Sequence, residues 1–366
     1  MGTEPGFGSP PMTRVWDIPV HDSTRVSDVR AAADAAAADA GFSELRRASA
    51  ALVATELATN LLRYGGGGRV LIETLPHPAA DAPREVQILC VDHGPGIPDL
   101  HLALRDGYSS TGDSLGAGLG TCRRTADVFD VHSVPGRGTV ALARLSRVPP
   151  ERHGTRPADL RPVRAGGVHV PLPGLEHSGD AWSQRSDGGV LDVLVADGLG
   201  HGLKAADASD AAVRHFHGRP PGGTPETVLR GMDGALRATR GAAIAVVRVD
   251  PAAGRLEFAG LGNIGARIYS GGRWQHLMSR PGIVGVHRPS RYAAVTHPWT
   301  ADTVLVLHSD GLPSRWQYLG DPVADHHDPA TLAAVILRDA SSQARLSPDD
   351  TTIAVVTAVP AQQERV

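Results

Sequence analysis

The sequence predicts an α+β protein made of two consecutive sandwich domains. Its 366 residues are enough for two domains of ordinary size, each with its own hydrophobic core. In both halves, apolar stripes with helical spacing alternate with short apolar runs that are typical of strands. A charged segment with four prolines and no apolar periodicity, residues 147–162, separates the halves as an interdomain linker would.

These observations give the expected domain boundaries. They are a disordered Gly/Pro-rich N-terminus at 1–12, a first domain at 13–146, a Pro/Arg-rich linker at 147–163, a second domain at 164–359 and a tail at 360–366.

The first half is expected to alternate helices and strands. An alanine-rich run predicts the first helix, and the spacing of Ala50, Val53, Leu57 and Leu61 predicts the second, which the glycines at 65–68 end. The expected helices are 26–40, 44–63 and 119–126. The expected strands are 69–75, 85–92, 129–133 and 139–145, the last two joined by a Pro-Gly-Arg-Gly turn.

The second half is expected to contain more strand. Two almost continuous apolar runs end in Asp-Gly, as buried strands followed by turns do. The expected strands are 190–196, 241–249, 255–259, 303–308 and 352–359, and the expected helices are 204–217, 225–239 and 329–342. A sheet-rich sandwich with helices on its outside is the natural packing.

Composition excludes several classes of function. A net charge of −3, without any basic run, gives no attraction for nucleic acid or an anionic membrane surface. No apolar run approaches the ~18 residues needed to cross a bilayer, and no signal peptide is visible. Two cysteines, Cys90 and Cys122, fit buried positions in a reducing cytoplasm. Lys204 is the only lysine, which excludes a P-loop and a eukaryotic-type protein kinase.

Three features of the first half could together bind a nucleotide. Glu56 and Asn60, four residues apart, share one face of a helix, where they could orient an attacking group and bind Mg²⁺. Asp92 follows a strand and precedes Gly-Pro-Gly, so its carboxylate could accept a hydrogen bond from adenine. Glycine-rich backbone at 107–120 opens a helix and could bind phosphate. Each feature alone is also common in a solvated helix face or an ordinary turn.

In their order and spacing the three features resemble the nucleotide-binding boxes of the GHKL ATPase/kinase superfamily. More narrowly, ELATNLLRYGGGG, VDHGPGIPDL and DGYSSTGDSLGAGLG resemble the anti-sigma-type serine/threonine kinases, and within them the RsbT-like switch kinases. The resemblance implies a Bergerat-type α/β sandwich that binds ATP with Mg²⁺. It also implies that the phosphate acceptor is a Ser or Thr of a STAS-domain anti-sigma antagonist. No dimerisation helix with an acceptor histidine precedes the domain, which disfavours a histidine kinase.

The same resemblance implies roles for individual residues. Glu56 would be the catalytic carboxylate, Asn60 the Mg²⁺ ligand and Asp92 the adenine ligand. The other expected ATP-binding residues are Gly94, Gly96, Gly116, Gly118, Gly120 and Thr139.

Acidic residues at strand ends or sharp turns mark the second half. Two carboxylates at adjacent strand ends repel each other unless cations lie between them. Carboxylate oxygens without His or Cys favour Mg²⁺ or Mn²⁺, and two such ions can activate a water for attack on a phosphoryl group. ADGLGHGLKAADAS, AGLGNIGARIY, LHSDGL and DDTTIAVV resemble the SpoIIE/RsbX branch of the PPM-type phosphatases, which implies an α-β-β-α sandwich and two Mn²⁺ or Mg²⁺ ions. The implied metal ligands are Asp180, Asp197, the carbonyl of Gly198, Asp310 and Asp349.

Three further residues are weaker candidates. The resemblance favours Asp349 over its neighbour Asp350, because the family ligand is the first residue of its signature. His201 is more consistent with a structural position than with a proton donor, and Arg164 is a phosphate-binding candidate by position only.

We therefore expect a bifunctional switch protein of the bacterial cytoplasm that controls sigma-factor or stress-response signalling. Its kinase would phosphorylate a STAS-domain protein, and its phosphatase would hydrolyse phosphoserine or phosphothreonine; a sigma factor or a downstream phosphatase are further candidate partners. The alternative is an anti-sigma factor that sequesters a sigma factor and carries a regulatory phosphatase. A third hypothesis makes one domain inactive, which the intact Glu56, Asn60 and acidic positions disfavour.

Overall fold

The computed structural model describes residues 14–75, 84–104, 118–149, 162–175, 177–287, 289, 291–323, 326–341 and 349–359. The predicted disordered N-terminus, the C-terminal tail, most of the predicted linker and the predicted ligand Gly116 lie outside these residues. Within them, no helix is long and apolar enough to cross a membrane.

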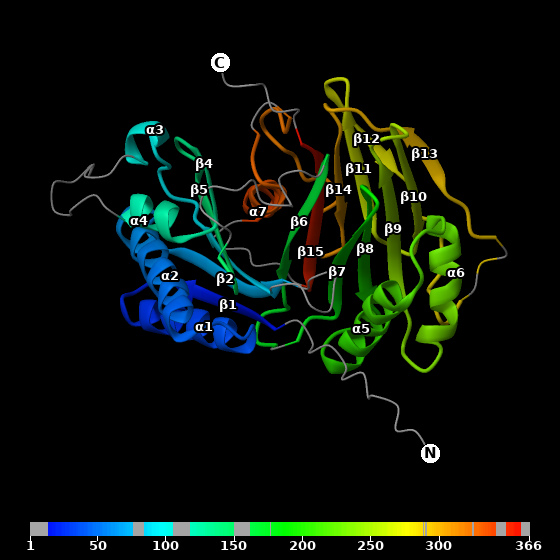
Figure 1. The fold of residues 1–366 in the computed structure, drawn as a ribbon, viewed down its shortest axis with the longest axis horizontal. Coiled ribbons are helices and arrows are strands. Elements are labelled where there is room, and N and C mark those ends of the chain that lie inside the picture. Colours follow the sequence, from blue (N-terminus) through cyan, green and yellow to red (C-terminus); the bar gives the residue numbers. More distant parts are fainter. Residues whose placement is uncertain are drawn as a thin grey trace.

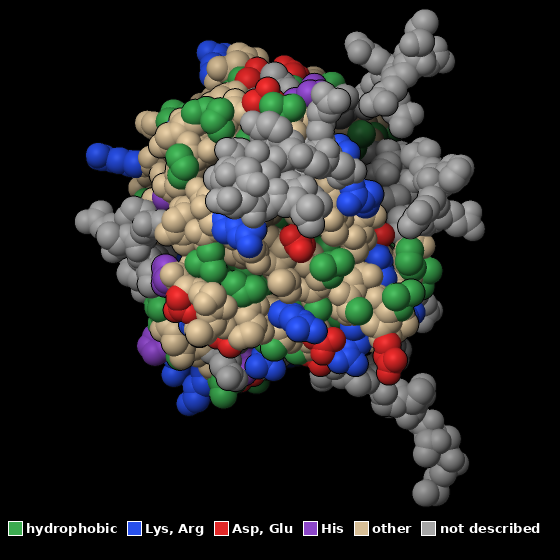
Figure 2. All heavy atoms as spheres, turned by 90° about the vertical axis from the view of Figure 1, so that its left-hand side faces the viewer, with side chains coloured by type: hydrophobic (Ala, Val, Ile, Leu, Met, Phe, Trp, Pro, Cys, Tyr) green, Lys and Arg blue, Asp and Glu red, His purple; other side chains and the backbone are tan. Residues whose placement is uncertain are grey.

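The first half is a five-stranded antiparallel sheet with helices on one face (Figure 1). The strands are β1 (Val15–Val20), β2 (Gly68–Leu75), β3 (Glu85–Val91), β4 (Val128–Val134) and β5 (Gly138–Ser146), in the order β1-β2-β3-β5-β4. The helices are α1 (Thr24–Asp39), α2 (Glu44–Tyr64), the short α3 (Leu100–Ala103) and α4 (Gly118–Thr125). Apolar residues of α1, α2 and α4 pack with alternate residues of the strands to form one core. The outer face formed by these helices carries acidic and basic side chains interspersed with apolar ones (Figure 2).

The second half consists of two packed five-stranded sheets with helices on both outer faces. One sheet has the order β13-β10-β9-β8-β7, with β7 (Asp180–Asp187), β8 (Val190–Gly198), β9 (Ala242–Asp250), β10 (Arg255–Leu261) and β13 (Val295–Pro298). It is covered by α5 (Leu203–Gly218) and α6 (Pro225–Leu236). The other has the order β12-β11-β14-β15-β6, with β6 (Val163–Val170), β11 (Gly265–Ser270), β12 (Arg273–Leu277), β14 (Val304–His308) and β15 (Thr351–Ala358). It is covered by α7 (Pro329–Ala340), so the predicted α-β-β-α sandwich is confirmed.

The two halves pack directly against each other through α7, which sequence analysis does not predict. The face of the first sheet that lacks α1 and α2 contributes Leu71, Leu89 and Leu142 to a core shared with α7, β6 and β15 (Figure 1). A buried ion pair crosses the same contact, because both terminal nitrogens of Arg144 donate to the Asp328 carboxylate, at 2.6 and 2.8 Å. The first sheet, α7 and the sheet that contains β6 and β15 therefore form consecutive packed layers.

Candidate active sites

Helix α2 places the predicted Glu56 and Asn60 on one face, beside the start of α4. The helix begins after Ser43, whose hydroxyl accepts a hydrogen bond from the Arg46 amide, and its apolar stripe is buried against the sheet. A side chain added at Gly118 would lie 3.0 Å from Glu56 Oε2 and 3.2 Å from Asn60 Nδ2. Glycine thus lets α4 start this close to the two side chains without displacing them. The Asn60 Nδ2 atom is buried and has no hydrogen-bond partner among the described residues.

Asp92 is held in one orientation by two backbone N–H groups, one from the loop that follows β3 and one from the first residues of β5, where the β4–β5 turn ends; we call these two segments the Asp92 loops. Its Oδ1 accepts hydrogen bonds from the amides of Gly94 at 2.9 Å and Thr139 at 3.1 Å. The residue is 8% exposed, and burial raises the pKa of its carboxyl, while these two hydrogen bonds lower it. The Thr139 hydroxyl lies 2.9 Å from that of Ser133, on the neighbouring strand β4.

The glycines around Asp92 are required by close backbone contacts. A side chain on Gly94 would meet the Gly65 carbonyl oxygen at 2.6 Å, and one on Gly96 would meet the Val134 carbonyl oxygen at 2.3 Å. Gly96 also has a φ of 71°, which favours glycine. Gly94 and Gly96 therefore shape the Asp92 loop by packing it against its neighbours.

The start of α4 is the expected phosphate-binding end of this site. Gly118 is the first residue of α4, and Gly120 is buried in its first turn. The first N–H groups of a helix lack intrahelical partners and favour anions. Since Glu56, Asn60 and Gly118 meet here, the structure brings the helix start, a carboxylate and a carboxamide together.

In the second half, the predicted Asp180 and Asp197 lie directly opposite each other in the β7–β8 register. Asp180 is fully buried, and its Oδ2 has no hydrogen-bond partner among the described residues. Burial and then the charge of Asp197 raise the pKa of Asp180 well above its usual range. Burial and then the charges of Asp310 and Asp349 raise the pKa of Asp197 to about 7. Such mutual repulsion is what bound cations relieve.

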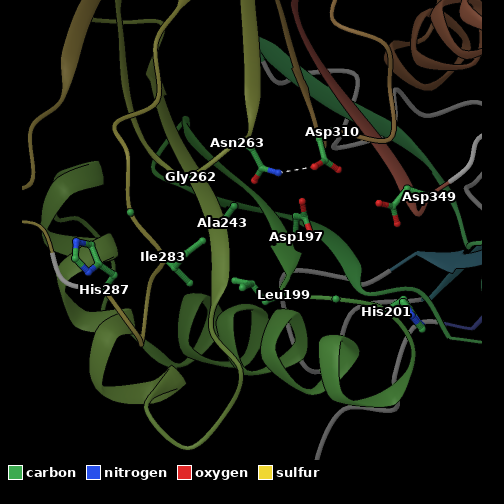
Figure 3. Close-up of a pocket in the computed structure, with 12 residues that line it drawn as sticks. Asp197, Leu199, His201, Ala243, Gly262, Asn263, Ile283, His287, Asp310 and Asp349 are labelled. Atoms are coloured by element: carbon green, nitrogen blue, oxygen red, sulfur yellow. Dashed lines mark hydrogen bonds between the residues drawn. The ribbon is translucent and has the colours of Figure 1, made fainter.

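Asp197, Asp310 and Asp349 point toward a common space in a pocket of about 600 Å³ (Figure 3). Asn263, which precedes β11, donates from Nδ2 to Asp310 Oδ2 at 2.5 Å. Sequence analysis did not single out Asn263, although it stands in the quoted AGLGNIGARIY segment. The only signal for it was that resemblance, because a lone Asn after Gly is more often a turn residue.

The neighbouring Asp350 has a different environment from Asp349. Its Oδ1 accepts from the Leu172 amide at 2.7 Å and its Oδ2 from the Gly179 amide at 2.8 Å, and the residue is 3% exposed. Both oxygens therefore fix the loop that leads to Asp180. Asp349 is exposed and lines the pocket, so the geometry favours it as the ligand.

The donor set fits divalent metal ions. The three carboxylates that point toward the common space offer oxygen ligands, as Mg²⁺ and Mn²⁺ prefer. Among the described residues, no three His, Cys, Asp or Glu side chains are close enough to hold one ion as they stand. A cation between these like charges would relieve their repulsion. Gly198 follows Asp197, and a side chain there would meet the Ala205 carbonyl oxygen at 2.1 Å, so only glycine allows α5 to approach.

The weaker candidates lie less favourably. His201 is exposed on the loop before α5, and its ring is turned away from the carboxylates (Figure 3). Arg164 pairs with Thr357, whereas Asp349 precedes the opposite end of β15. Six residues of strand span about 20 Å, so Arg164 is too far away to bind the phosphate.

Comparison with known proteins identifies both halves. Residues 20–144 match the histidine kinase-like ATPase domain family, and residues 187–359 match the stage II sporulation protein E (SpoIIE) family. The chain is 38% identical over 103 residues to the serine/threonine-protein kinase RsbT of Bacillus subtilis, covering 28% of this chain and 74% of RsbT. The chain belongs to the RsbT-like serine/threonine kinases. Its second half is a SpoIIE-type PPM phosphatase domain.

Further similarities are to phosphatases. The chain is 24% identical over 135 residues to the phosphoserine phosphatase RsbX of Bacillus subtilis, covering 37% of this chain and 67% of RsbX. Among solved structures, RsbX in complex with magnesium gives a TM-score of 0.44 at 20% identity, covering 54% of this chain and 95% of RsbX. The PP2C phosphatase domain of SpoIIE from Bacillus subtilis, with a fragment of its regulatory domain, gives 0.45 at 17% identity, covering 91% of this chain and 92% of that one. This RsbT-like protein is thus a serine/threonine kinase and a PPM-type phosphatase in one chain.

Proposed function

We propose that this protein adds and removes the same phosphate on a STAS-domain partner in the bacterial cytoplasm, and so controls a sigma-factor or stress-response pathway. The domain boundaries we propose are 13–146 for the kinase and 164–359 for the phosphatase, with 147–163 between them. The observation that supports the proposal is that one chain holds two sets of residues suited to opposed reactions: Glu56, Asn60 and Asp92 in one half, and four carboxylates in the other.

In the kinase half, some residues would bind Mg-ATP and another would act in phosphoryl transfer. Asp92 has one oxygen fixed by backbone amides, which leaves the other to accept a hydrogen bond from the adenine amine. Asn60 is half-buried, and we assign its Oδ1 as the ligand of Mg²⁺, which neutralises phosphate charge when bound. Glu56 is half-buried one helical turn before it, and it would orient the acceptor hydroxyl and take its proton. The glycines at the start of α4 offer free N–H groups to the phosphates.

In the phosphatase half, some residues are proposed metal ligands and others fix the orientation of those ligands. The metal ligands that we propose are Asp180, Asp197, the Gly198 carbonyl, Asp310 and Asp349. Two Mn²⁺ or Mg²⁺ ions, when bound there, supply an activated water and positive charge that stabilises the phosphoryl oxygens. Asn263 fixes the orientation of the Asp310 carboxylate through its amide. Asp350 fixes the loop before Asp180. Leu199 and Ile283 line the same pocket.

The partner can be trapped by a chain that binds but cannot turn over. Glu56→Gln combined with Asp310→Asn keeps both sites folded and removes both reactions. A pull-down with this double variant from the native cytoplasm should recover a STAS-domain protein. Recovery of a sigma factor without any STAS protein would instead support the anti-sigma alternative.

Removal of the same phosphate is tested with single variants of the full chain. The Asp310→Asn chain should label the recovered STAS partner from radioactive ATP, and the Glu56→Gln chain with Mn²⁺ should then release the label. The double variant is the control and should release nothing, and a chelator should stop the release. Label that survives an excess of the Glu56→Gln chain would show that the two halves serve different substrates.

A further inference from the structure

Helix α7 belongs to the phosphatase half, yet it lies between two sheets, one from each half (Figure 1). The residues from Pro329 to Arg338 are all buried. A helix that is apolar on all sides must be covered on all sides. One side of α7 packs on β6 and β15, and the other side packs on β3, β4 and β5.

The last turn of α7 reaches the two loops that hold Asp92. Arg338 is 1% exposed, and its Nη1 donates to the Gly138 carbonyl at 3.3 Å and to His132 Nδ1 at 3.4 Å. The carbonyl of Arg338 accepts a hydrogen bond from His93 Nε2 at 2.9 Å. That contact also satisfies a carbonyl at the C-terminal end of the helix, where intrahelical donors are missing.

These contacts lie next to the two amides that fix the Asp92 carboxylate. His93 precedes Gly94, and Gly138 precedes Thr139, and it is the N–H groups of Gly94 and Thr139 that donate to Asp92. Arg338 therefore bridges the two loops one residue away from each of these hydrogen bonds. Its positive charge also lowers the pKa of Asp92 and opposes the effect of burial, which is the largest one.

A structural explanation alone does not account for a guanidinium at this position. Arg338 Nε donates to Asp339 at 2.9 Å, and Asp339 is also paired with Arg137 at 2.9 Å. The Nη2 atom of Arg338 is buried without a hydrogen-bond partner among the described residues. A buried donor without a partner costs free energy, so packing of α7 alone would not favour an arginine here. A role in holding the Asp92 loops would explain why an arginine is present at this position.

We propose that Arg338 is a positioning residue of the ATP site, which holds the loops of His93 and Gly138 so that Asp92 meets the adenine ring. The inference rests on the proposed function, which makes Asp92 the adenine ligand. It follows that the ATP site of the kinase half is completed by a residue of the phosphatase half.

The test is nucleobase discrimination by the full-length protein, measured as the equilibrium affinities for Mg-ATP and Mg-GTP by calorimetry. Arg338→Met should weaken Mg-ATP binding about tenfold, the scale of one lost hydrogen bond to a charged group, and change Mg-GTP binding little. Arg338→Lys keeps a cation at the site and should restore part of the preference for ATP. Hydrolysis of an aryl phosphate with Mn²⁺ should stay within about twofold, because Arg338 lies outside the metal pocket.

Arg144→Met is the matched control, because Arg144 is a buried arginine of the same interface that contacts Asp328 and Gln87 and not the Asp92 loops. It should lower stability but leave the ratio of the two affinities unchanged. Asp92→Asn tests the assignment on which the inference rests. If Asp92→Asn keeps the native preference for ATP, the proposed adenine site is wrong. If Asp92→Asn loses it and Arg338→Met keeps it, Arg338 has no positioning role and the inference is overturned.

Discussion

Adjacent residues of this chain can have different roles, and the backbone hydrogen bonds that each one accepts determine its role. Asp349 and Asp350 have the same side chain, but both oxygens of Asp350 accept backbone hydrogen bonds while Asp349 lies at the pocket. A carboxylate with both oxygens occupied is poorly suited to bind metal. Sequence analysis favoured Asp349 on the resemblance alone, since spacing cannot distinguish two neighbouring acids.

The Asp349/Asp350 pair gives the first prediction. Asp349→Asn should abolish Mn²⁺-dependent hydrolysis of an aryl phosphate and leave metal-free stability unchanged or higher, because it removes one of the mutually repelling charges. Asp350→Asn should instead lower the free energy of unfolding by about 1–3 kcal/mol, because its amide group cannot accept from the loop amide that it faces. Activity at saturating Mn²⁺, together with urea unfolding in chelator, separates the two. The ligand assignment would be reversed if Asp350→Asn lost activity and Asp349→Asn kept it.

In the kinase half, substitutions of Glu56 and Asn60 should differ in their effects on ATP binding and on phosphoryl transfer. Asn60→Ala removes the proposed Mg²⁺ ligand, so Mg-ATP binding should weaken and phosphoryl transfer should fall by about two or more orders of magnitude. Glu56→Gln removes only a charge, so Mg-ATP binding should persist while transfer is lost. Calorimetry and transfer of label to the trapped partner measure the two effects. Normal transfer by both variants would rule out this site.

At the scale of whole elements, sequence analysis located long periodic segments well and missed short or polar ones. The stripe of Ala50, Val53, Leu57 and Leu61 predicted α2 because helix α2 buries only one face. Strand β6 carries Gly166 and Gly167, which weaken any strand pattern, yet a side chain on Gly166 would meet the Ala330 amide at 2.7 Å. Gly166 serves the approach of α7, and Gly167 lies against Ile353 and Trp182, so both meet long-range requirements that no local pattern shows.

The contact of β2 and β3 with β6 also predicts that the stability of the protein depends on pH. Glu73 on β2 is fully buried beside Gln87, which donates to it at 2.7 Å and to the Gly167 carbonyl of β6 at 3.0 Å. Burial raises the pKa of Glu73 from 4.5 to about 7, partly offset by the hydrogen bond from Gln87. The folded state then holds a proton that the unfolded state releases above pH 4.5, so this group makes stability fall as pH rises from 4.5 to 7.

Glu73→Gln should remove that part of the pH dependence. The variant should match the native protein near pH 4.5 and exceed it at pH 8, by up to about 3 kcal/mol in the free energy of unfolding. Urea unfolding at a series of pH values measures the difference. A native profile for the variant would mean that Glu73 is ionised in the folded protein.

At the scale of the whole molecule, α7 joins two enzymes with opposed activities. In the chain it stands between the proposed ligands Asp310 and Asp349, and in space its last turn contacts the proposed adenine loops. Sequence analysis predicted both sites but placed a linker between two independent domains, because Pro329–Ala340 reads as an ordinary buried helix. What its second face covers is a property of the packed molecule.

The Arg144–Asp328 ion pair tests whether the halves unfold as one unit. Removing one partner of a buried pair costs about 3–5 kcal/mol, because the other charge stays buried. Arg144→Met should therefore make the contact between the halves melt at a lower temperature but leave α7 docked in the folded protein, where Asp328 still caps α7 through the Ala330 amide at 2.9 Å. Calorimetry should show one transition for the native protein and two for the variant, and ATP should raise only the transition of the kinase half. In the native protein ATP should raise the single transition, and so stabilise the phosphatase half as well. Two transitions in the native protein, with ATP acting on one alone, would mean that the packed halves fold independently.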